Sequence, residues 1–199
     1  MYPSGHPAKP ADPAGHGDAN LTGEAAFVEL QGDIEEVFAS GLFDELTDDG
    51  QATINEIVEV AGLDAASNLP ATATYSGTFV AGDEGDDFFG ELTGVMELDV
   101  DFDGGSLTGS MSNMLLTEDG DAETVNGSLD IAGNVQDANI AGNISGRLST
   151  DGSGVDVTGD MAGQFRGDGA TRGAGILDLF ASDGTDSADF GGGWVVTKD

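Results

Sequence analysis

Carboxylates at alternate positions are the residues of this sequence whose type and spacing could bind a metal ion or take part in catalysis. Asp99, Asp101 and Asp103 precede Gly104, which imitates the start of the calcium-binding loop of an EF-hand. Carboxylate oxygens are the hard ligands that Ca²⁺ prefers. The twelfth position of such a loop falls on Ser110 instead of a glutamate, and the flanking residues have the pattern of strands. The sequence therefore favours a solvated acidic strand face over a calcium site.

A second imitation of a calcium loop covers residues 45–56. Gly50 stands sixth and Glu56 stands twelfth, as in an EF-hand, and Asp49 stands fifth, at one of the usual ligand positions. Glu45 and Thr47 occupy the first and third positions, where the EF-hand pattern has aspartate or asparagine. We keep Asp49 and Glu56 as candidate Ca²⁺ ligands beside the first group of three aspartates.

Other groups that could bind a metal or catalyse a reaction are sparser. His6 and His16 lie ten residues apart in a stretch rich in proline and glycine, and they would share a metal only if that stretch folds. The acidic turns at 83–87 and 118–121 could collect cations loosely or be simply solvated. Acids are plentiful enough to supply the paired carboxylates of a glycosidase, yet none stands alone on an apolar strand face where burial would raise its pKa. We therefore expect a non-enzyme without a cofactor.

The net charge of the chain is extreme. Thirty-eight acidic residues against five basic ones give −33 at pH 7, and no lysine or arginine occurs between Lys9 and Arg147. This balance argues against a nucleic-acid partner, because phosphate binding needs a basic footprint. It suits a saline or extracellular setting, where salt screens the self-repulsion. We expect Arg147, Arg166 and Arg172 to balance neighbouring carboxylates, with the anchoring of an acidic partner as the alternative.

The first 20 residues have the composition of an extended arm. They hold four of the five prolines and almost no large apolar side chain. The arm is either disordered or ordered against a neighbouring subunit. It shows no basic region followed by an apolar run, so we expect no secretory signal, and no stretch of the chain approaches the length of a membrane span. The sequence contains no cysteine, so we expect neither disulfides nor a lipid-modified N-terminal cysteine.

Residues 21–69 have the periodicity of one or two short helices. The first apolar face comprises Phe27, Leu30, Ile34, Val37 and Phe38. The second comprises Ile54, Ile57, Val58 and Val60, and Gly62 is a plausible stop. We expect these helices to form a lid or docking element packed on one end of the following domain, or an exposed surface for a partner.

Strand signals replace helix signals after Pro70. The clearest segment alternates Leu92, Met96, Leu98 and Val100 with acidic and hydroxyl side chains, a period of two that gives one apolar face. Eight such segments are separated by glycine- and aspartate-rich turns, at 71–81, 91–103, 106–117, 125–135, 138–149, 154–166, 174–181 and 188–197. Eight short, evenly spaced strands predict a mainly β fold, an antiparallel up-and-down barrel that is closed so that no edge stays unpaired.

Four glycine-rich segments carry a resemblance to a known family. They read LPATATYSGTFVAG, LTGVMELDVDFDGGSLTGSM, DMAGQFRGDGATRGAGILDLF and FGGGWVVTKD, and the chief motif places Gly163, Phe165 and Gly167 at alternate positions. Residues 70–199 resemble the barrel domain of transferrin-binding protein B and related bacterial surface lipoproteins. The resemblance implies an eight-stranded barrel that binds another protein at a surface without catalysis. We expect no signal peptide, no lipidated cysteine and no second lobe, and in these expectations the sequence departs from the family.

The sequence thus predicts three parts, an arm at 1–20, a helical segment at 21–69 and a barrel at 70–199. The function favoured at this stage is a non-catalytic decoration or cement-like subunit. It would dock on a larger assembly, such as a virus or phage particle, through residues 1–20 and 21–69, and it would be exposed on the particle surface. One alternative is a secreted or surface-exposed binding protein for an iron or haem carrier. A second alternative is a calcium-stabilised adhesion module.

Overall fold

Alternating apolar and polar side chains fold the second part of the chain into eight antiparallel strands. The computed structural model describes residues 46–83, 90–118, 120–150 and 153–199. The arm at 1–20 and the first predicted helix, up to residue 45, lie outside the described residues. The elements are α2 (Asp48–Ala61), β1 (Thr72–Asp83), β2 (Glu91–Asp101), β3 (Ser106–Glu118), β4 (Asp121–Gln136), β5 (Asn139–Thr150), β6 (Ser153–Arg166), β7 (Arg172–Ser182) and β8 (Ser187–Lys198).

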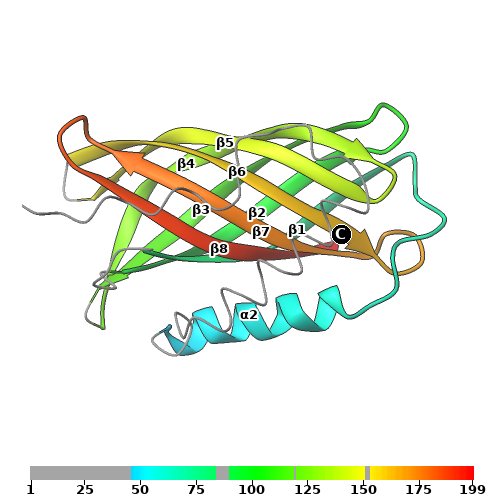
Figure 1. Cartoon of the computed structure of the whole chain (residues 1–199), viewed down its shortest axis with the longest axis horizontal. Coiled ribbons are helices and arrows are strands. Elements are labelled where there is room, and N and C mark those ends of the chain that lie inside the picture. Colours follow the sequence, from blue (N-terminus) through cyan, green and yellow to red (C-terminus); the bar gives the residue numbers. More distant parts are fainter. Residues whose placement is uncertain (1–45, 84–89, 119, 151–152) are drawn as a thin grey trace, which may run out of the picture.

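The strands form a closed barrel. Each pairs with its neighbour in the sequence, and β8 pairs back onto β1 from Tyr75 opposite Lys198 to Asp83 opposite Phe190. Figure 1 shows the strands tilted around a common axis, with the red β8 beside the teal β1. The predicted antiparallel up-and-down barrel of eight strands is therefore confirmed, and each predicted segment corresponds to one strand.

Some strands begin or end at other residues than predicted, because local turns and strand pairing set their limits. β2 ends at Asp101, two residues early, because the Asp101 carboxylate accepts a hydrogen bond from the Gly104 N–H at 2.7 Å and turns the chain. Gly105 completes this turn at φ 69°, a left-handed conformation that glycine adopts without strain. β4 begins at Asp121, four residues early, because its ladder with β3 continues to the pair Glu118–Asp121.

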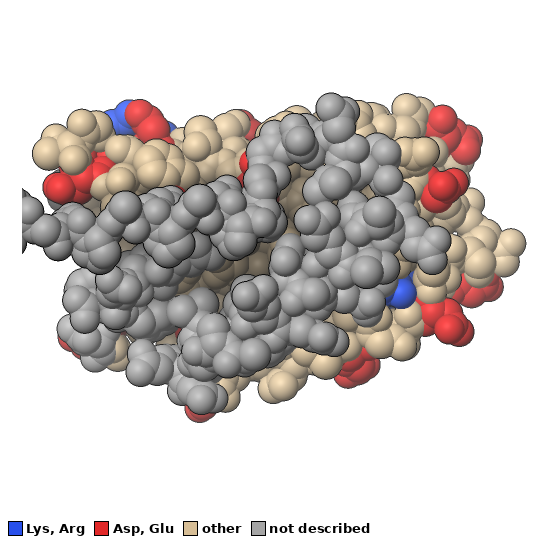
Figure 2. Space-filling model, in the orientation of Figure 1, with Lys and Arg blue, Asp and Glu red and all other residues tan. Residues whose placement is uncertain are grey.

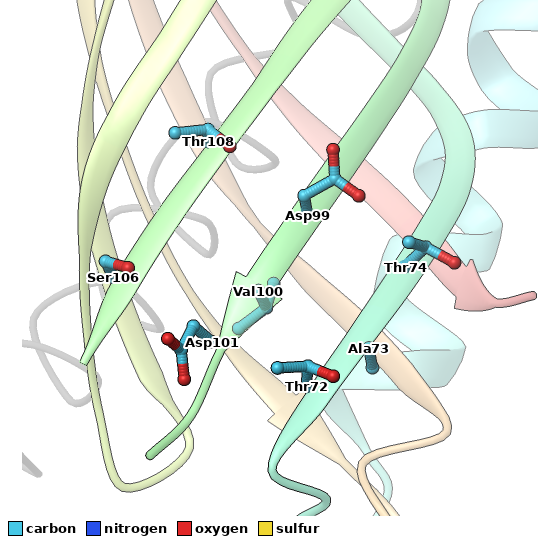
Figure 3. A pocket seen from close by; sticks show the side chains of 8 residues that line it. All are labelled: Thr72, Ala73, Thr74, Asp99, Val100, Asp101, Ser106 and Thr108. Atoms are coloured by element: carbon cyan, nitrogen blue, oxygen red, sulfur yellow. The ribbon is translucent and has the colours of Figure 1, made fainter. Parts of the chain in front are cut away.

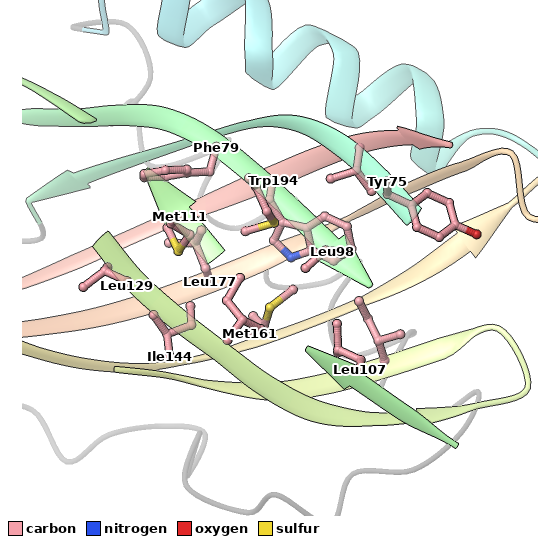
Figure 4. Packing of buried hydrophobic residues seen from close by; sticks show 14 of the residues in the cluster. Tyr75, Phe79, Leu98, Leu107, Met111, Leu129, Ile144, Met161, Leu177 and Trp194 are labelled. Atoms are coloured by element: carbon pink, nitrogen blue, oxygen red, sulfur yellow. The ribbon is translucent and has the colours of Figure 1, made fainter. Parts of the chain in front are cut away.

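Large apolar side chains fill the barrel. Figure 4 shows aromatic, methionine and aliphatic side chains from all sides of the barrel meeting along its interior. The Trp194 side chain is 0% exposed, and its indole N–H donates to the Ile176 carbonyl at 3.1 Å. The fully buried side chains include Tyr75, Phe79, Phe165, Met96, Leu98, Leu107, Met111, Met114, Leu129 and Ile144. The interior is thus a packed core, as expected where small barrels are filled by side chains.

Glycine gives the indole its space in this core. A Cβ atom on Gly163 would lie 2.3 Å from Cζ2 of Trp194 and 2.5 Å from the Ala174 carbonyl oxygen. Glycine at position 163 therefore permits the close approach of the indole to β6.

Adding a methyl group at Gly163 is expected to destabilise the fold. Overpacking of a dense core costs about 1–3 kcal/mol, so Gly163→Ala should lower the free energy of unfolding by about 2 kcal/mol. Gly142→Ala is the matched control on β5, because the nearest atom to its Cβ is the Ala132 carbonyl oxygen at 3.3 Å. Urea unfolding of both variants checks the prediction, and equal losses would contradict it.

Tyr75 is a buried tyrosine whose hydroxyl is paired. The hydroxyl donates to the Ala170 carbonyl at 2.8 Å, and the ring stacks on Phe165 with centroids 4.5 Å apart. Burial raises the pKa of Tyr75 above its ordinary value, because the phenolate form would lose its hydration.

The fold should therefore lose stability in alkali through Tyr75. Above about pH 10 a tyrosine in the unfolded chain ionises while buried Tyr75 keeps its proton, so the free energy of unfolding falls as the pH rises. Tyr75→Phe should remove this part of the slope, at the cost of about 1 kcal/mol at neutral pH for the lost hydrogen bond. Urea unfolding of both proteins at several pH values checks this, and identical alkaline slopes would contradict it.

The helix α2 lies along the outer wall of the barrel (Figure 1). Ile54, Ile57 and Val60 pack on outward-facing Val80, Ala174 and Val195 of strands β1, β7 and β8. Thr47 caps the helix start by accepting a hydrogen bond from the Gly50 N–H. Gly62 caps the helix end, where the sequence predicts the stop. Val58, predicted on the apolar face, is half exposed.

The expected position of the helix on one end of the barrel is wrong. Apolar Val80, Ala174 and Val195 make part of the side wall hydrophobic, and α2 covers that part. Gly193 of β8 leaves room for the Ile57 side chain of the helix, because a Cβ atom on Gly193 would lie 2.8 Å from Cδ1 of Ile57. Among the described elements, α2 therefore packs mainly on the outer faces of β1, β7 and β8.

Candidate functional site

A buried carboxylate fixes the start of α2 to the barrel. Glu91, at the first position of β2, is 2% exposed. One of its oxygens accepts from the Thr47 N–H at 2.6 Å and the other accepts from the Thr47 hydroxyl, also at 2.6 Å. A negative charge at a helix N-terminus is favourable. Glu91 therefore acts as a structural clamp, and the acidic composition around it gave no signal for this role.

Two arginines hold the other end of α2. Arg172 of β7 pairs with Glu59, at 3.1 Å, and with Glu56. Arg166 of β6 is buried and donates to the Leu63 carbonyl at 3.0 Å, just beyond the helix. Burial lowers the pKa of Arg166 below its ordinary value. Arg172 thus balances carboxylates of this chain itself, as expected, and Arg166 holds the segment just beyond the helix through a carbonyl.

Arg147 balances charge in the same way on the opposite wall. It pairs with Asp156 at 2.8 Å across β5 and β6, and both side chains are mostly exposed. Exposed ion pairs contribute little to stability, whereas Arg172 is less exposed and contacts two carboxylates.

Arg172→Gln should lower the free energy of unfolding by about 1 kcal/mol and Arg147→Gln by less than about 0.5 kcal/mol. Thermal melts at low and high salt test this order, and a larger loss for Arg147→Gln would contradict it.

The first surface hollow lies on the outer faces of β1, β2 and β3 (Figure 3). Strand register places Thr74, Asp99 and Thr108 in one transverse row. A second row comprises Thr72, Asp101 and Ser106. The hollow thus offers hydroxyl and carboxylate oxygens at its surface, which accept hydrogen bonds from a partner or bind cations weakly.

The first group of candidate calcium ligands is divided by the turn after β2. Asp99 and Asp101 lie in the hollow, whereas Asp103 lies in the turn beyond the strand. One Asp101 oxygen already accepts from the Gly104 N–H. In the described residues no group of three or more His, Asp or Glu side chains is placed to hold a metal ion. Calcium binding at these aspartates stays a prediction.

The second group of candidate ligands lies on a helix instead of a loop. α2 begins at Asp48, so the loop expected over residues 45–56 is replaced by helix from that residue on. Asp49 and Glu56 are seven residues apart, which separates them by roughly 10 Å along the helix axis. Glu56 pairs with Arg172. This geometry does not bring Asp49 and Glu56 together, and a calcium role for them stays a prediction.

The remaining candidates fall mostly outside the described residues. His6 and His16 lie in the arm, and most of the acidic turn at 83–87 lies between described ranges. In the turn at 118–121, Glu118 and Asp121 form the last cross-strand pair of β3 and β4. Their roles stay predictions.

A second surface hollow lies on the outer faces of β5 to β8, with a volume of about 440 Å³. Strand register aligns Asn143, Asp160 and Asp178 in one row, and the Asn143 amide donates to Asp160 at 2.6 Å. The adjacent row places Phe180 beside Asp189. Sequence reasoning did not single out Phe180. The signal was available, because Leu177 and Leu179 alternate with Asp178 and Phe180 along the sequence, which puts Phe180 on the polar face of the strand.

The part of the surface visible in Figure 2 is mainly acidic and neutral. Carboxylates, drawn in red, occur around the barrel, whereas basic side chains, drawn in blue, appear only in small patches outside the grey region. Within the described residues no helix has the length and apolar character needed to cross a membrane. The accessible chemistry of the described barrel is thus that of an acidic, hydroxyl-rich outer surface with two shallow hollows.

Comparisons with known proteins concern this barrel. The barrel resembles transferrin-binding protein B. The crystal structure of isotype 1 of that protein from serogroup B Neisseria meningitidis matches with a TM-score of 0.45 and 16% identity, over 69% of this chain and 28% of that chain. A double mutant of transferrin-binding protein B from Haemophilus parasuis Hp5 matches with a TM-score of 0.44 and 15% identity, over 68% and 28%.

These matches agree with the resemblance read from the sequence, and at such identities they concern the fold alone. This chain spans 28% of the length of the transferrin-binding proteins it matches. No family model matches the sequence, and no curated protein sequence does either.

Proposed function

We propose that this protein is a non-catalytic binding barrel that engages a protein partner through its outer surface. The filled interior carries this proposal. Trp194, Phe79, Met96 and Met111 are each 0% exposed and occupy the space in which a ligand-carrying barrel would hold a small molecule. Recognition is thereby left to the outside, where both hollows lie.

The outer surface suits contact with a protein. Antiparallel strands offer rows of hydroxyl, amide and carboxylate side chains, such as Thr74, Asp99 and Thr108. Such rows supply many weak polar contacts on a rigid support, and carboxylates steer a partner with positive charge toward the surface. The clamp between Glu91 and Thr47 and the pair of Arg172 with Glu59 hold α2 against one wall, which gives the surface a fixed shape.

The family resemblance makes an iron or haem carrier protein the first partner class to test. The same proposal places the protein in an exposed position at a surface, where it can meet such a carrier. Purified carrier proteins, including transferrin in iron-free and iron-loaded forms, are passed over the immobilised full chain in a surface plasmon resonance experiment. Saturable binding that weakens as salt rises is the expected result. Absence of saturable binding across the carriers would overturn this partner class.

The decoration of a virus or phage particle, favoured from the sequence, stays a prediction. Sedimentation of native source material tests it separately, because only a particle subunit travels with a large assembly.

A further inference from the structure

The sequence carries the pattern Asn-x-Ser/Thr three times, and this pattern is the acceptor signal for N-linked glycosylation. Two copies lie in the barrel, at residues 126–128 on β4 and at residues 143–145 on β5. The third begins at Asn20, outside the described residues. In both barrel copies the asparagine and the serine are exposed, so strand alternation places them on the outer face. The two copies differ in the backbone that carries them.

The copy on β4 coincides with a β-bulge. The register between β3 and β4 shifts between Met111 and Met114. Residues 126–128 of β4 therefore face only residues 112–113 of β3, and the ladder gives them no register partner on that side. Gly127 has φ 116°, which residues with a Cβ atom rarely adopt. The bulge thus interrupts the pairing of β4 with β3 at the three residues of the acceptor pattern.

The side chains of the two asparagines also differ. In the described part of the chain, the Asn126 amide makes no hydrogen bond. Asn143 pairs in register with Ala132 on one side and with Asp160 on the other, and its amide donates to the Asp160 carboxylate at 2.6 Å. A sugar donor can therefore reach the amide nitrogen of Asn126 without breaking a described hydrogen bond, whereas that of Asn143 is held.

We propose that Asn126 is the acceptor of an N-linked oligosaccharide in the folded chain and that the bulge selects it over Asn143. The donor is an oligosaccharide carried on a lipid diphosphate, and an oligosaccharyltransferase catalyses the transfer. The Asn126 amide nitrogen forms a bond to C1 of the first sugar, while the bond from C1 to the diphosphate oxygen breaks. The amide gives up one proton to a base of the transferase, and the lipid diphosphate leaves. The Ser128 hydroxyl is the second recognition element of the pattern.

The position of Asn126 leaves the proposed binding surface accessible. Residue 126 lines neither of the two hollows, and α2 packs mainly on β1, β7 and β8. An N-linked glycan is bulky and solubilising, and it occurs on exposed surfaces. The inference therefore goes beyond the proposed function and does not depend on the class of partner.

Transfer in vitro to the folded full chain tests the proposal. The donor is a synthetic lipid diphosphate carrying chitobiose, and the enzyme is a purified single-subunit oligosaccharyltransferase that accepts Asn-x-Ser/Thr without an acidic residue before it. All chains carry Asn20→Gln, so that transfer outside the described residues does not contribute. The intact mass should rise by one disaccharide, which peptide mapping should place on Asn126. Transfer to Asn126 should exceed transfer to Asn143 by about tenfold or more, because the Asn143 amide must first give up its hydrogen bond to a carboxylate.

Variants separate recognition of the pattern from general exposure. Asn126→Gln and Ser128→Ala should each abolish the gain in mass, and Ser128→Thr should keep it. Asn143→Gln, the matched control on the neighbouring strand, should leave the gain unchanged. Circular dichroism confirms that each chain is folded before transfer. No transfer to the folded chain, equal transfer to Asn126 and Asn143, or transfer that survives Ser128→Ala would each overturn the proposal.

Two peptides show whether the fold makes the selection. Peptides of residues 122–130 and 139–147 lack the ladder and the contact with Asp160, so both should accept the disaccharide at similar rates. Resistance of the 139–147 peptide to transfer would contradict selection by the fold. Binding of carrier proteins is measured separately on the unmodified chain, so a failure of the proposed function and a failure of this inference are distinguishable.

Discussion

Replacing Trp194 with alanine is expected to lower the free energy of unfolding by about 3–5 kcal/mol. The indole is fully buried at the centre of the barrel, beside Gly163 on β6 and Gly175 on β7. Its removal leaves a cavity that a closed barrel of paired strands fills poorly by collapse. It also removes the hydrogen bond from the indole N–H to the Ile176 carbonyl.

Urea unfolding followed by far-ultraviolet circular dichroism measures this loss, since the variant has no tryptophan fluorescence. Phe180→Ala is the matched control, an aromatic on the outer face whose truncation should change stability by less than about 0.5 kcal/mol. Similar losses in the two variants would contradict the assignment of Trp194 to the core and Phe180 to the surface.

Glu91→Ala is expected to lower the free energy of unfolding by about 2–3 kcal/mol, because the part-buried N–H and hydroxyl of Thr47 lose their acceptor. The N-terminus of α2 also loses a favourable negative charge. Glu91→Gln keeps one acceptor oxygen and should lose less.

Hydrogen exchange shows where the effect of Glu91→Ala falls. Amides of α2 should exchange faster in the variant, whereas those at the centre of β4 and β5, on the opposite wall, should change little, because undocking of the helix is a local opening. Glu97→Ala, at an exposed position of the same strand, is the control and should leave exchange in α2 unchanged. Uniformly faster exchange in all strands would contradict the role of Glu91 as a local clamp.

The barrel could be predicted from the sequence because each strand carries its own signal. Alternation of Leu92, Met96, Leu98 and Val100 with polar residues fixes one inward face, and turns rich in glycine and aspartate separate the strands. Closure follows from the number of strands and from the need to pair the edges. The predicted apolar face of Leu92, Met96, Leu98 and Val100 is buried in the barrel.

The position of α2 and the two hollows could not be predicted in the same way. Docking of the helix depends on Val80, Ala174 and Val195, which come from three strands and adjoin only after the barrel closes. Glu91 is one acid among 38, and nothing in its local sequence separates a buried clamp from a solvated carboxylate. The hollow at Phe180 likewise depends on the register that brings Asp189 of β8 beside β7.

The central claim is that the interior of the barrel is a filled core and that recognition lies outside it. A titration of the full chain with a long-chain fatty acid tests this claim most directly. Trp194, the one tryptophan of the sequence, reports on the interior through its fluorescence. Its emission maximum and intensity should stay unchanged at every concentration of the fatty acid, because the core has no room for a ligand. A saturable one-to-one change in Trp194 emission would contradict the claim and would make the barrel a carrier of small apolar molecules.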